Sequence, residues 1–253
     1  MKRTIIITAT AFITALIAFS AVMVLPLVLT PAPPAETATT NGGRQGFCWV
    51  VVHDEGRLTG LIRITADTTT KRIQVVGYPP ETEVVYGVEV TTAAAMFSRY
   101  RERVTSMIDA GDTVMFSVDG LTSMMGRLVG NLPLNLRETA AGLTAGRHAV
   151  TPLQVAALLR HDDYEDGGME QARIHAEVMT EFLQRVLIPS ADLSAVFAVV
   201  TEYSDTRLHI AQFAAIESDL PLLCTGASYT AAVAAGEMTG VGERRRFVCR
   251  SIE

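Results

Sequence analysis

The chain has 253 residues, of which 49% are hydrophobic and 19% charged, and its formal net charge at pH 7 is −6. This composition excludes a disordered, collagen-like or disulfide-dense protein, and the acidic balance argues against nucleic-acid binding through a basic face. The length is sufficient for one or two domains with a sizeable hydrophobic core.

The apolar surplus lies near the N-terminus, where residues 4–30 form a run without a charged side chain. As a helix this run would be about 40 Å long, against about 30 Å of hydrocarbon in a bilayer. Lys2 and Arg3 precede it and no basic residue follows before Arg44, so we expect a cytoplasmic N-terminus. A cleaved signal peptide is the alternative, but its apolar part is usually about 7–15 residues long, which favours a membrane anchor.

Residues 31–46 are rich in proline, glycine and small polar residues, which favour an extended linker over a core. The predicted protein is therefore a single-pass cell-membrane protein with a cytoplasmic stub (1–3), a transmembrane anchor (4–30), this linker and an extracytoplasmic domain (47–253). Without Lys2 and Arg3 the net charge changes from −6 to −8, so bulk charge would not hold the domain against an anionic membrane surface.

Short apolar runs alternate with helical patterns along this domain. Strands are predicted at 47–52, 61–66, 73–76, 113–118 and 247–252. Helices are predicted at 92–108, 121–129, 152–160, 169–187, 193–203 and 206–218. Thr151 followed by Pro152 is typical of a helix start, with an N-cap and then the first helical residue. The interleaved elements predict an α/β domain in which helices cover a central sheet.

The three cysteines are compatible with two states. Cys224 and Cys249 could form a disulfide and leave Cys48 free, as an exported domain allows, or all three could be buried free thiols. No cysteine or histidine spacing predicts a zinc site.

Two stretches of the domain resemble the LytR-CpsA-Psr family. Residues 112–136 (DTVMFSVDGLTSMMGRLVGNLPLNL) are similar to a strand, helix and glycine turn of that family. Residues 143–160 (LTAGRHAVTPLQVAALLR) are more specific, because Gly146, Val150, Gln154 and Arg160 fall at the spacing of a family motif. The resemblance extends over nearly all of 47–253, although its motifs are specific over only part of that range.

The resemblance implies a three-layer α/β/α domain with a central mixed sheet, preceded by one transmembrane helix. It also implies an extracytoplasmic phosphotransferase that moves a glycopolymer from a polyprenyl-pyrophosphate carrier onto peptidoglycan, usually with Mg²⁺. Arginines would clamp the pyrophosphate, and carboxylates would hold Mg²⁺ or activate the accepting hydroxyl. An apolar tunnel would hold the lipid tail.

Several of the side chains that this chemistry needs are missing. The family's SIPRD segment falls on 77–81, where Pro79 matches, Pro80 replaces the arginine and Glu81 replaces the aspartate. Proline cannot bind a phosphate, whereas glutamate could hold a metal at a shifted position. A further family aspartate falls on or near Thr59.

The family's R..RQ helix fits residues 168–179 in two registers. One register places Arg173 and Ala176 at the two arginine positions, and the other places Gln171 and Ile174 there. In either register at least one family arginine is absent, so a clamp of two arginines is not assured.

The resemblance nevertheless implies a set of candidate site residues. Arg160 and Glu81 would be catalytic, with Glu81 as the Mg²⁺ ligand, and Arg160, Arg173 and Gln154 would bind substrate. Each has a structural alternative: Arg160, for example, could simply pair with Asp162 or Asp163 at the end of its helix. The acidic run 162–166 could likewise hold a divalent cation or be a solvated loop.

Two functions therefore remain open. The chain is either an active Mg²⁺-dependent glycopolymer phosphotransferase with a rearranged site, or a degenerate, non-catalytic member that binds lipid or protein at the envelope. The missing aspartate and Pro80 favour the second function, and the motif around Arg160 supports the first.

Overall fold

The computed structural model describes residues 45–86, 89–100, 112–205, 220–240 and 246–249. All of them belong to one compact unit, Gly43–Glu253. The predicted anchor, most of the predicted linker and the predicted helix at 206–218 lie outside the described residues, so they stay predictions. Among the described helices, none is long and apolar enough to span a bilayer.

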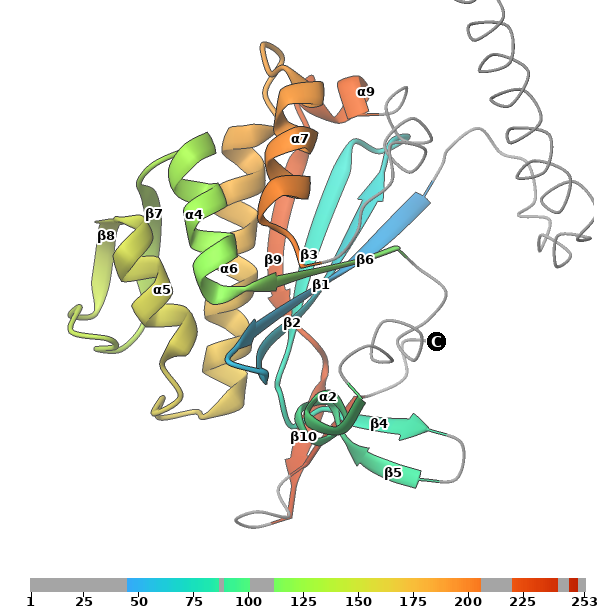
Figure 1. Ribbon diagram of the computed structural model, residues 1–253, viewed down its shortest axis with the longest axis vertical. Coiled ribbons are helices and arrows are strands. Elements are labelled where there is room, and N and C mark those ends of the chain that lie inside the picture. The colour runs from blue at the N-terminus through green and yellow to red at the C-terminus, as the bar shows by residue number, and fades with distance from the viewer. Residues whose placement is uncertain (1–44, 87–88, 101–111, 206–219, 241–245, 250–253) are drawn as a thin grey trace, which may run out of the picture. The chain divides into compact units, whose positions relative to one another are not determined.

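A five-stranded mixed sheet forms the centre of the domain (Figure 1). Its order is β6-β1-β2-β3-β9, in which β1 and β6 are parallel, β3 and β9 are parallel, and the remaining neighbours are antiparallel. The strands are β1 (Gln45–Asp54), β2 (Arg57–Asp67), β3 (Arg72–Tyr78), β6 (Asp112–Ser117) and β9 (Ser228–Val233). The central mixed sheet is thus confirmed.

The first hairpin is fixed by its turn. Asp54 pairs with Arg57, and the two residues between them both have positive φ, 48° at Glu55 and 85° at Gly56. Such a two-residue turn matches the twist of antiparallel strands, and glycine adopts positive φ without strain. A bulge between Val52 and His53 then shifts the pairing by one residue, which places Trp49 opposite Arg63.

Helices cover both faces of the sheet, which confirms the three-layer α/β/α architecture. One face packs against α4 (Val118–Leu128), α5 (Pro152–Arg160), α6 (Gly168–Val186) and α7 (Leu193–Tyr203), which lie together in Figure 1. The other face packs against α2 (Ala93–Tyr100), where Met96 and Phe97 contact a second cluster of buried residues from the sheet. Alternation along β1 separates the clusters, because Val50 and Val52 face the first and Trp49 and Val51 the second.

The sequence patterns missed several small elements. The structure adds the hairpins β4 (Glu83–Tyr86) with β5 (Glu89–Thr92) and β7 (Leu132–Leu136) with β8 (Gly146–Val150). It also adds β9 at the edge of the central sheet, α9 (Leu220–Cys224) and β10 (Gly236–Thr239). β10 pairs with β11 (Arg246–Cys249), the start of the predicted last strand. These elements are short, and their hydrogen-bond partners lie at positions that no local pattern reveals.

The cysteines correspond to neither predicted state in full. None of the three thiols forms a disulfide, so the predicted Cys224–Cys249 bond is not present. Cys224 is buried, Cys48 is half-buried and Cys249 is exposed, so they are also not three buried thiols.

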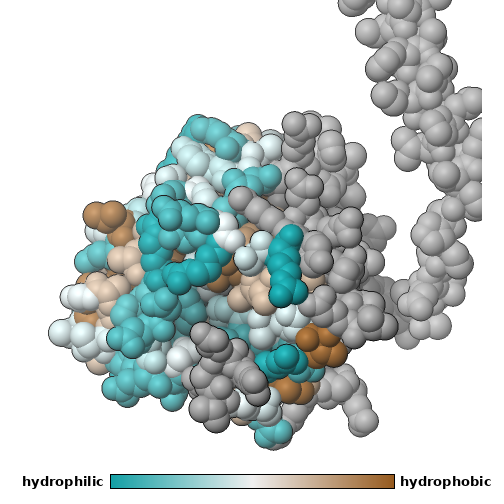
Figure 2. Space-filling view, turned by 60° about the horizontal axis from the view of Figure 1, so that its bottom comes forward, coloured by the Kyte–Doolittle hydropathy of each residue, from teal (hydrophilic) through white to brown (hydrophobic). Residues whose placement is uncertain are grey.

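Few large hydrophobic side chains of the described residues are exposed. Figure 2 shows one face, on which hydrophobic residues form small separate groups among hydrophilic ones. The large hydrophobic side chains that are exposed are Val90, Leu153, Ile188, Leu222 and Val248.

Helix α6 packs closely against β2 and β3 at two glycines, which have no side chain. A Cβ atom added to Gly77 on β3 would collide with the backbone carbonyl of Ala172, and one added to Gly60 on β2 would collide with the ring of His175. These two glycines therefore set how deeply α6 packs against the sheet.

We expect Gly77→Ala to destabilise the domain by about 1–3 kcal/mol, because the added methyl group must push α6 from β3. Gly46→Ala is the matched control, since Gly46 also lies in a strand but has no atom within 4 Å of its Cβ position. Urea unfolding followed by circular dichroism measures both changes. Equal stability of the two variants would contradict the close contact.

His175 is fully buried on α6, and this burial lowers its pKa from 6.5 to about 4 although the backbone carbonyl of Gln171 acts in the opposite direction. Its Nδ1 donates a hydrogen bond of 2.8 Å to that carbonyl, so Nε2 carries no proton. Nε2 is buried and has no hydrogen-bond partner among the described residues. The folded state therefore favours the neutral ring.

A histidine with a lowered pKa in the folded state stabilises the protein above the unfolded pKa and loses that contribution as the pH falls. We expect the unfolding free energy to decrease between pH 6.5 and 4 with a His175 contribution of up to about 1.4 kcal/mol per pH unit. His175→Met should reduce this slope, whereas His148→Gln, on strand β8, should not. Unfolding curves at several pH values test this, and identical slopes in both variants would disprove the assignment.

Candidate functional site

The predicted start of α5 is confirmed, and the helix brings Arg160 to a charged cluster at its other end. Thr151 accepts a hydrogen bond from the backbone N–H of Gln154, and the Gln154 side chain accepts one from the backbone N–H of Thr151. Pro152 occupies the first turn. This capping box stabilises the N-terminus of α5. The Gln154 side chain, a predicted substrate ligand, is thus occupied by capping in this structure.

Arg160 joins two carboxylates from separate elements. Its Nε donates a 3.0 Å hydrogen bond to Asp54 at the end of β1, and its Nη2 donates a 2.7 Å bond to Asp119 in the first turn of α4. The bond to Asp119 and the weaker effect of Asp54 outweigh partial burial and raise the pKa of Arg160. We call Asp54, Asp119 and Arg160 the Arg160 cluster; its formal charge is −1.

The neighbouring ion pair differs from the predicted one. Asp162 binds Arg57 at 3.3 Å, and both side chains are 63% exposed. Water and salt screen such a pair, so it adds little stability. The structural alternative predicted that Arg160 pairs with Asp162 or Asp163, and these partners are wrong. Its expectation that carboxylates bind Arg160 is confirmed. Asp54 and Asp119 escaped sequence analysis because their proximity to Arg160 depends on the fold.

The segment that replaces SIPRD leads from the end of β3 into a turn before β4. The backbone N–H and the hydroxyl of Thr82 both donate to the carbonyl of Pro79, at 2.9 and 2.6 Å. The carbonyl of Pro80 accepts a hydrogen bond from Ala94 in the first turn of α2. Pro80 therefore supports the turn and the start of α2, and offers no cation at this position.

Glu81 lies against the N-terminus of α6. A Cβ atom added to Gly168 would collide with the Glu81 carboxylate, whose Oε2 is buried and has no hydrogen-bond partner among the described residues. A carboxylate is favoured near a helix N-terminus, whose N–H groups carry partial positive charge. The unpartnered oxygen could accept a metal ion, but the described residues contain no group of three or more Asp, Glu, His or Cys that could hold one. Glu81 alone does not fit a fixed Mg²⁺ site.

The face of α6 near this segment carries small side chains. Gly168 lies beside Glu81, and Ala172 lies beside Gly77. The α6 residues in contact with the Gly77–Glu81 segment are thus a glycine and an alanine, and not an arginine in either register of the family helix.

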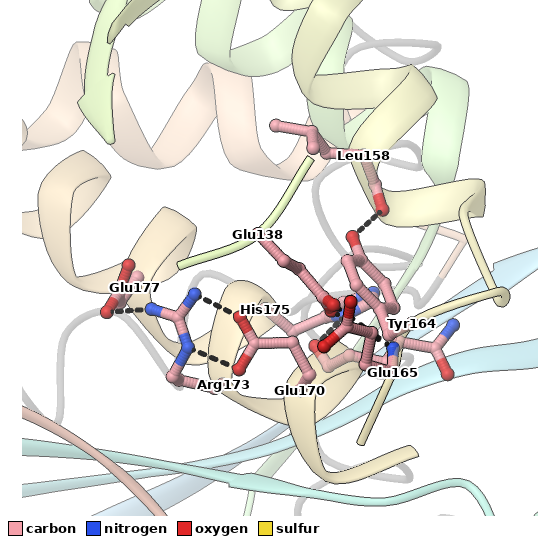
Figure 3. A network of polar contacts seen from close by, with 9 residues as sticks. Glu138, Leu158, Tyr164, Glu165, Glu170, Arg173, His175 and Glu177 are labelled. Atoms are coloured by element: carbon pink, nitrogen blue, oxygen red, sulfur yellow. Dashed lines mark hydrogen bonds and ion pairs between the residues drawn. The ribbon is translucent and has the colours of Figure 1, made fainter. Parts of the chain in front are cut away.

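The Arg173 side chain is buried and forms ion pairs with two glutamates of its own helix, α6. Its Nε donates a 2.7 Å hydrogen bond to Glu170, its Nη2 also binds Glu170, and its Nη1 binds Glu177 (Figure 3). Only 7% of the Arg173 side chain and 6% of the Glu170 side chain are exposed. Burial opposes its charge, but the bonds to Glu170 and Glu177 prevail and raise the pKa of Arg173. The guanidinium is thus occupied by carboxylates of its own helix.

Tyr164 is buried near Glu170. Its hydroxyl donates a 3.0 Å hydrogen bond to the carbonyl of Leu158, and Glu138 accepts one from the backbone N–H of Glu165 (Figure 3). Burial, followed by the charges of Glu170 and Glu138, raises the pKa of Tyr164. The tyrosine is therefore neutral and structural at physiological pH.

Thr59 also has a structural role. It is buried, and its hydroxyl donates a 3.1 Å hydrogen bond to the carbonyl of Val52 across the first hairpin. It supplies no carboxylate at the position where the family aspartate was expected.

The space between the sheet and helices α4–α6 is filled by side chains. Leu121, Met124, Met125, Leu158, Leu159 and Ile174 are each no more than 1% exposed and belong to one continuous cluster with the sheet. On this face the described residues form a packed core, and this core contains no open tunnel of the kind that the resemblance implied.

Comparison with solved structures finds domains with this architecture. TagV of B. subtilis aligns with a TM-score of 0.63 at 13% identity, over 82% of this chain and 91% of that one. A transcriptional regulator from Enterococcus faecalis aligns at 0.63 and 14% identity, over 82% of both chains. TagT, in a structure described as bound to LI-WTA, aligns at 0.64 and 10% identity, over 88% of both chains. No family model and no curated protein sequence matches the chain.

These structural similarities show that the chain has a LytR-CpsA-Psr-like fold in a divergent sequence. The fold brings Arg160 together with Asp54 and Asp119, places Glu81 at the start of α6, and seals Arg173 between glutamates. Within the described part of the chain, no hydrogen bond or ion pair joins these three candidate side chains to one another.

We expect Arg173→Met to destabilise the domain by about 3–5 kcal/mol, because it leaves the Glu170 carboxylate buried without its partner. Arg185→Met is the matched control on the same helix. Arg185 binds Glu181 at 2.7 Å, but both side chains are about one-third exposed, so its loss should change stability by about 1 kcal/mol or less. Urea unfolding compares the variants, and similar losses would show that the Arg173 pair is not buried.

Proposed function

We propose that the chain is a cell-envelope protein of the LytR-CpsA-Psr type that binds polyprenyl-pyrophosphate-linked glycopolymers and transfers them to peptidoglycan weakly or not at all. The apolar run at 4–30 would anchor it in the cell membrane, with the folded domain outside. The fold and the presence of TagT, bound to LI-WTA, among the similar structures support the ligand class.

The state of Arg173 carries the proposal that transfer is weak or lost. A phosphate must compete with Glu170 and Glu177 for a guanidinium that is almost fully buried. Opening this contact would leave Glu170 as an unpaired buried charge, which costs several kcal/mol. With Pro80 in place of the SIPRD arginine, the two-cation clamp needed for the developing charge of a transferring phosphate is missing.

Arg160 is the candidate side chain that can still contact a phosphate. Its side chain is 35% exposed, and two of its five N–H donors are directed to Asp54 and Asp119. The net negative charge of the Arg160 cluster weakens the attraction for an anion, so we expect binding to be modest.

A transferring enzyme remains the alternative, favoured by one observation. The unpartnered Glu81 oxygen beside the N-terminus of α6 is a possible Mg²⁺ contact. The described residues contain no group of three or more Asp, Glu, His or Cys that could complete a Mg²⁺ site around it.

The test combines binding with turnover on the full-length chain in non-ionic detergent with Mg²⁺. We expect a polyprenyl pyrophosphate to bind and no inorganic phosphate to be released above the protein-free rate. Arg160→Gln should weaken binding several-fold through the lost charge-assisted hydrogen bonds. Arg147→Gln is the control, because Arg147 is exposed on β8, away from the cluster.

Two results would overturn the proposal. Mg²⁺-dependent phosphate release that Glu81→Gln abolishes would establish the transfer alternative. Absence of binding in the unmodified chain, or equal binding by Arg160→Gln, would exclude Arg160 as the ligand contact.

A further inference from the structure

Arg63 lies on the face of the sheet opposite the Arg160 cluster's helices. Arg63 is two residues after Leu61 on β2, so both side chains lie on the same face of the sheet. Leu61 belongs to the buried cluster that packs against α2. Trp49 on β1 is its direct cross-strand partner, and Thr113 on β6 is the partner of Trp49 on the other side. Three neighbouring strands thus place Arg63, Trp49 and Thr113 in one row.

Arg63 differs from the other arginines of the described residues. Arg57, Arg127, Arg160, Arg173, Arg185 and Arg246 bind carboxylates. Arg99 is exposed to water, and Arg72, Arg137 and Arg147 are exposed without an ion pair to another described residue. Arg63 is half-buried, and no ion pair joins it to a carboxylate among the residues that the structure describes. A partly desolvated cation without a counter-charge is unfavourable unless an anion binds it.

Three polar atoms in this row have no partner. Arg63 Nε, Trp49 Nε1 and Thr113 Oγ1 are buried and make no hydrogen bond in the part of the chain that the structure describes. Trp49 is only 6% exposed, so its indole N–H is not solvated in this conformation. Buried donors normally have partners, and unpaired ones indicate a missing acceptor.

Aromatic rings surround the guanidinium. Its central carbon lies 4.7 Å from the centre of the Phe47 ring and 6.0 Å from that of Trp49. The Tyr78 ring packs on Trp49 with 5.1 Å between ring centres, and its hydroxyl lies close enough to Arg63 for the cation to oppose the rise of its pKa caused by burial. The rings and the Tyr78 hydroxyl orient Arg63, but they supply no negative charge and no partner for its Nε.

We propose that Arg63, Trp49 and Thr113, with Phe47 and Tyr78 as aromatic walls, form a second anion-binding site that takes a phosphate group. Arginine binds phosphate with two parallel hydrogen bonds, and the indole N–H and the threonine hydroxyl can donate further ones. The aromatic walls suit the apolar part of a phosphate ester. The site is independent of the Arg160 cluster and does not depend on the function proposed above.

The chain contains a single tryptophan, and Trp49 therefore reports directly on this site. We expect phenyl phosphate or inorganic phosphate to change the Trp49 fluorescence of the full-length chain in a saturable way. Phenol serves as the uncharged control and should give no saturable change. A stronger response to phenyl phosphate identifies an ester as the preferred source, and an equal response identifies the free phosphate group.

Arg63→Gln should weaken phosphate binding about tenfold or more, because a charge-assisted contact is lost. Arg63→Lys keeps the charge but not the planar fork and should bind with intermediate affinity. Arg72→Gln, on the neighbouring strand β3, is the control and should bind as the unmodified chain does. Circular dichroism confirms that each variant is folded.

The proposal is overturned if the unmodified chain gives no saturable response to either phosphate, or if folded Arg63→Gln responds with unchanged affinity. Loss of binding in Arg160→Gln with retention in Arg63→Gln would assign the phosphate to the Arg160 cluster. If Arg63→Gln does not fold, phosphate binding by Arg63→Lys is the test instead. Unchanged phosphate affinity of Arg63→Lys, together with saturable binding of phenol, would contradict a phosphate site.

Discussion

The close approach of α6 to the central sheet is the constraint on which the rest of the domain depends. Gly60 and Gly77 provide the room on the sheet, and Gly168 and Ala172 provide it on the helix. Because the helix lies this near, its adjacent residues become part of the interior, and Arg173 is buried with them. The same packing that stabilises the domain thus removes one of the two arginines expected for phosphate chemistry from solvent.

The sequence was informative where local patterns are strong. The periodicity of 169–187 and the Thr151–Pro152 start correspond to α6 and α5, and the apolar runs correspond to β1–β3 and β6. Contacts between distant residues were beyond its reach, as with Asp54 and Asp119 beside Arg160. One site contact was readable: Glu170 and Glu177 stand three residues before and four residues after Arg173, at the spacing of helical ion pairs.

Three arginines of the described residues differ in burial and in the charge of their partners. Arg173 is buried and neutralised, Arg160 is partly exposed between two carboxylates, and Arg63 is half-buried among aromatic rings without a carboxylate. An alternating strand pattern does not distinguish Arg63 from any other polar residue in a strand. Its environment is set by the register of β1, β2 and β6, which only the folded sheet reveals.

The outer edge of β3 is covered by a strand from the far end of the chain. β9 pairs with β3 from Arg72–Ser228 to Gly77–Val233, and Phe247 donates a backbone hydrogen bond to Glu81 just beyond β3. Until those late residues have been synthesised, β3 presents an unpaired edge that could pair with another chain. Contacts of such long sequence separation also slow folding. A truncation that removes β9 would therefore act as an aggregation hazard at β3, far from the missing residues in the sequence.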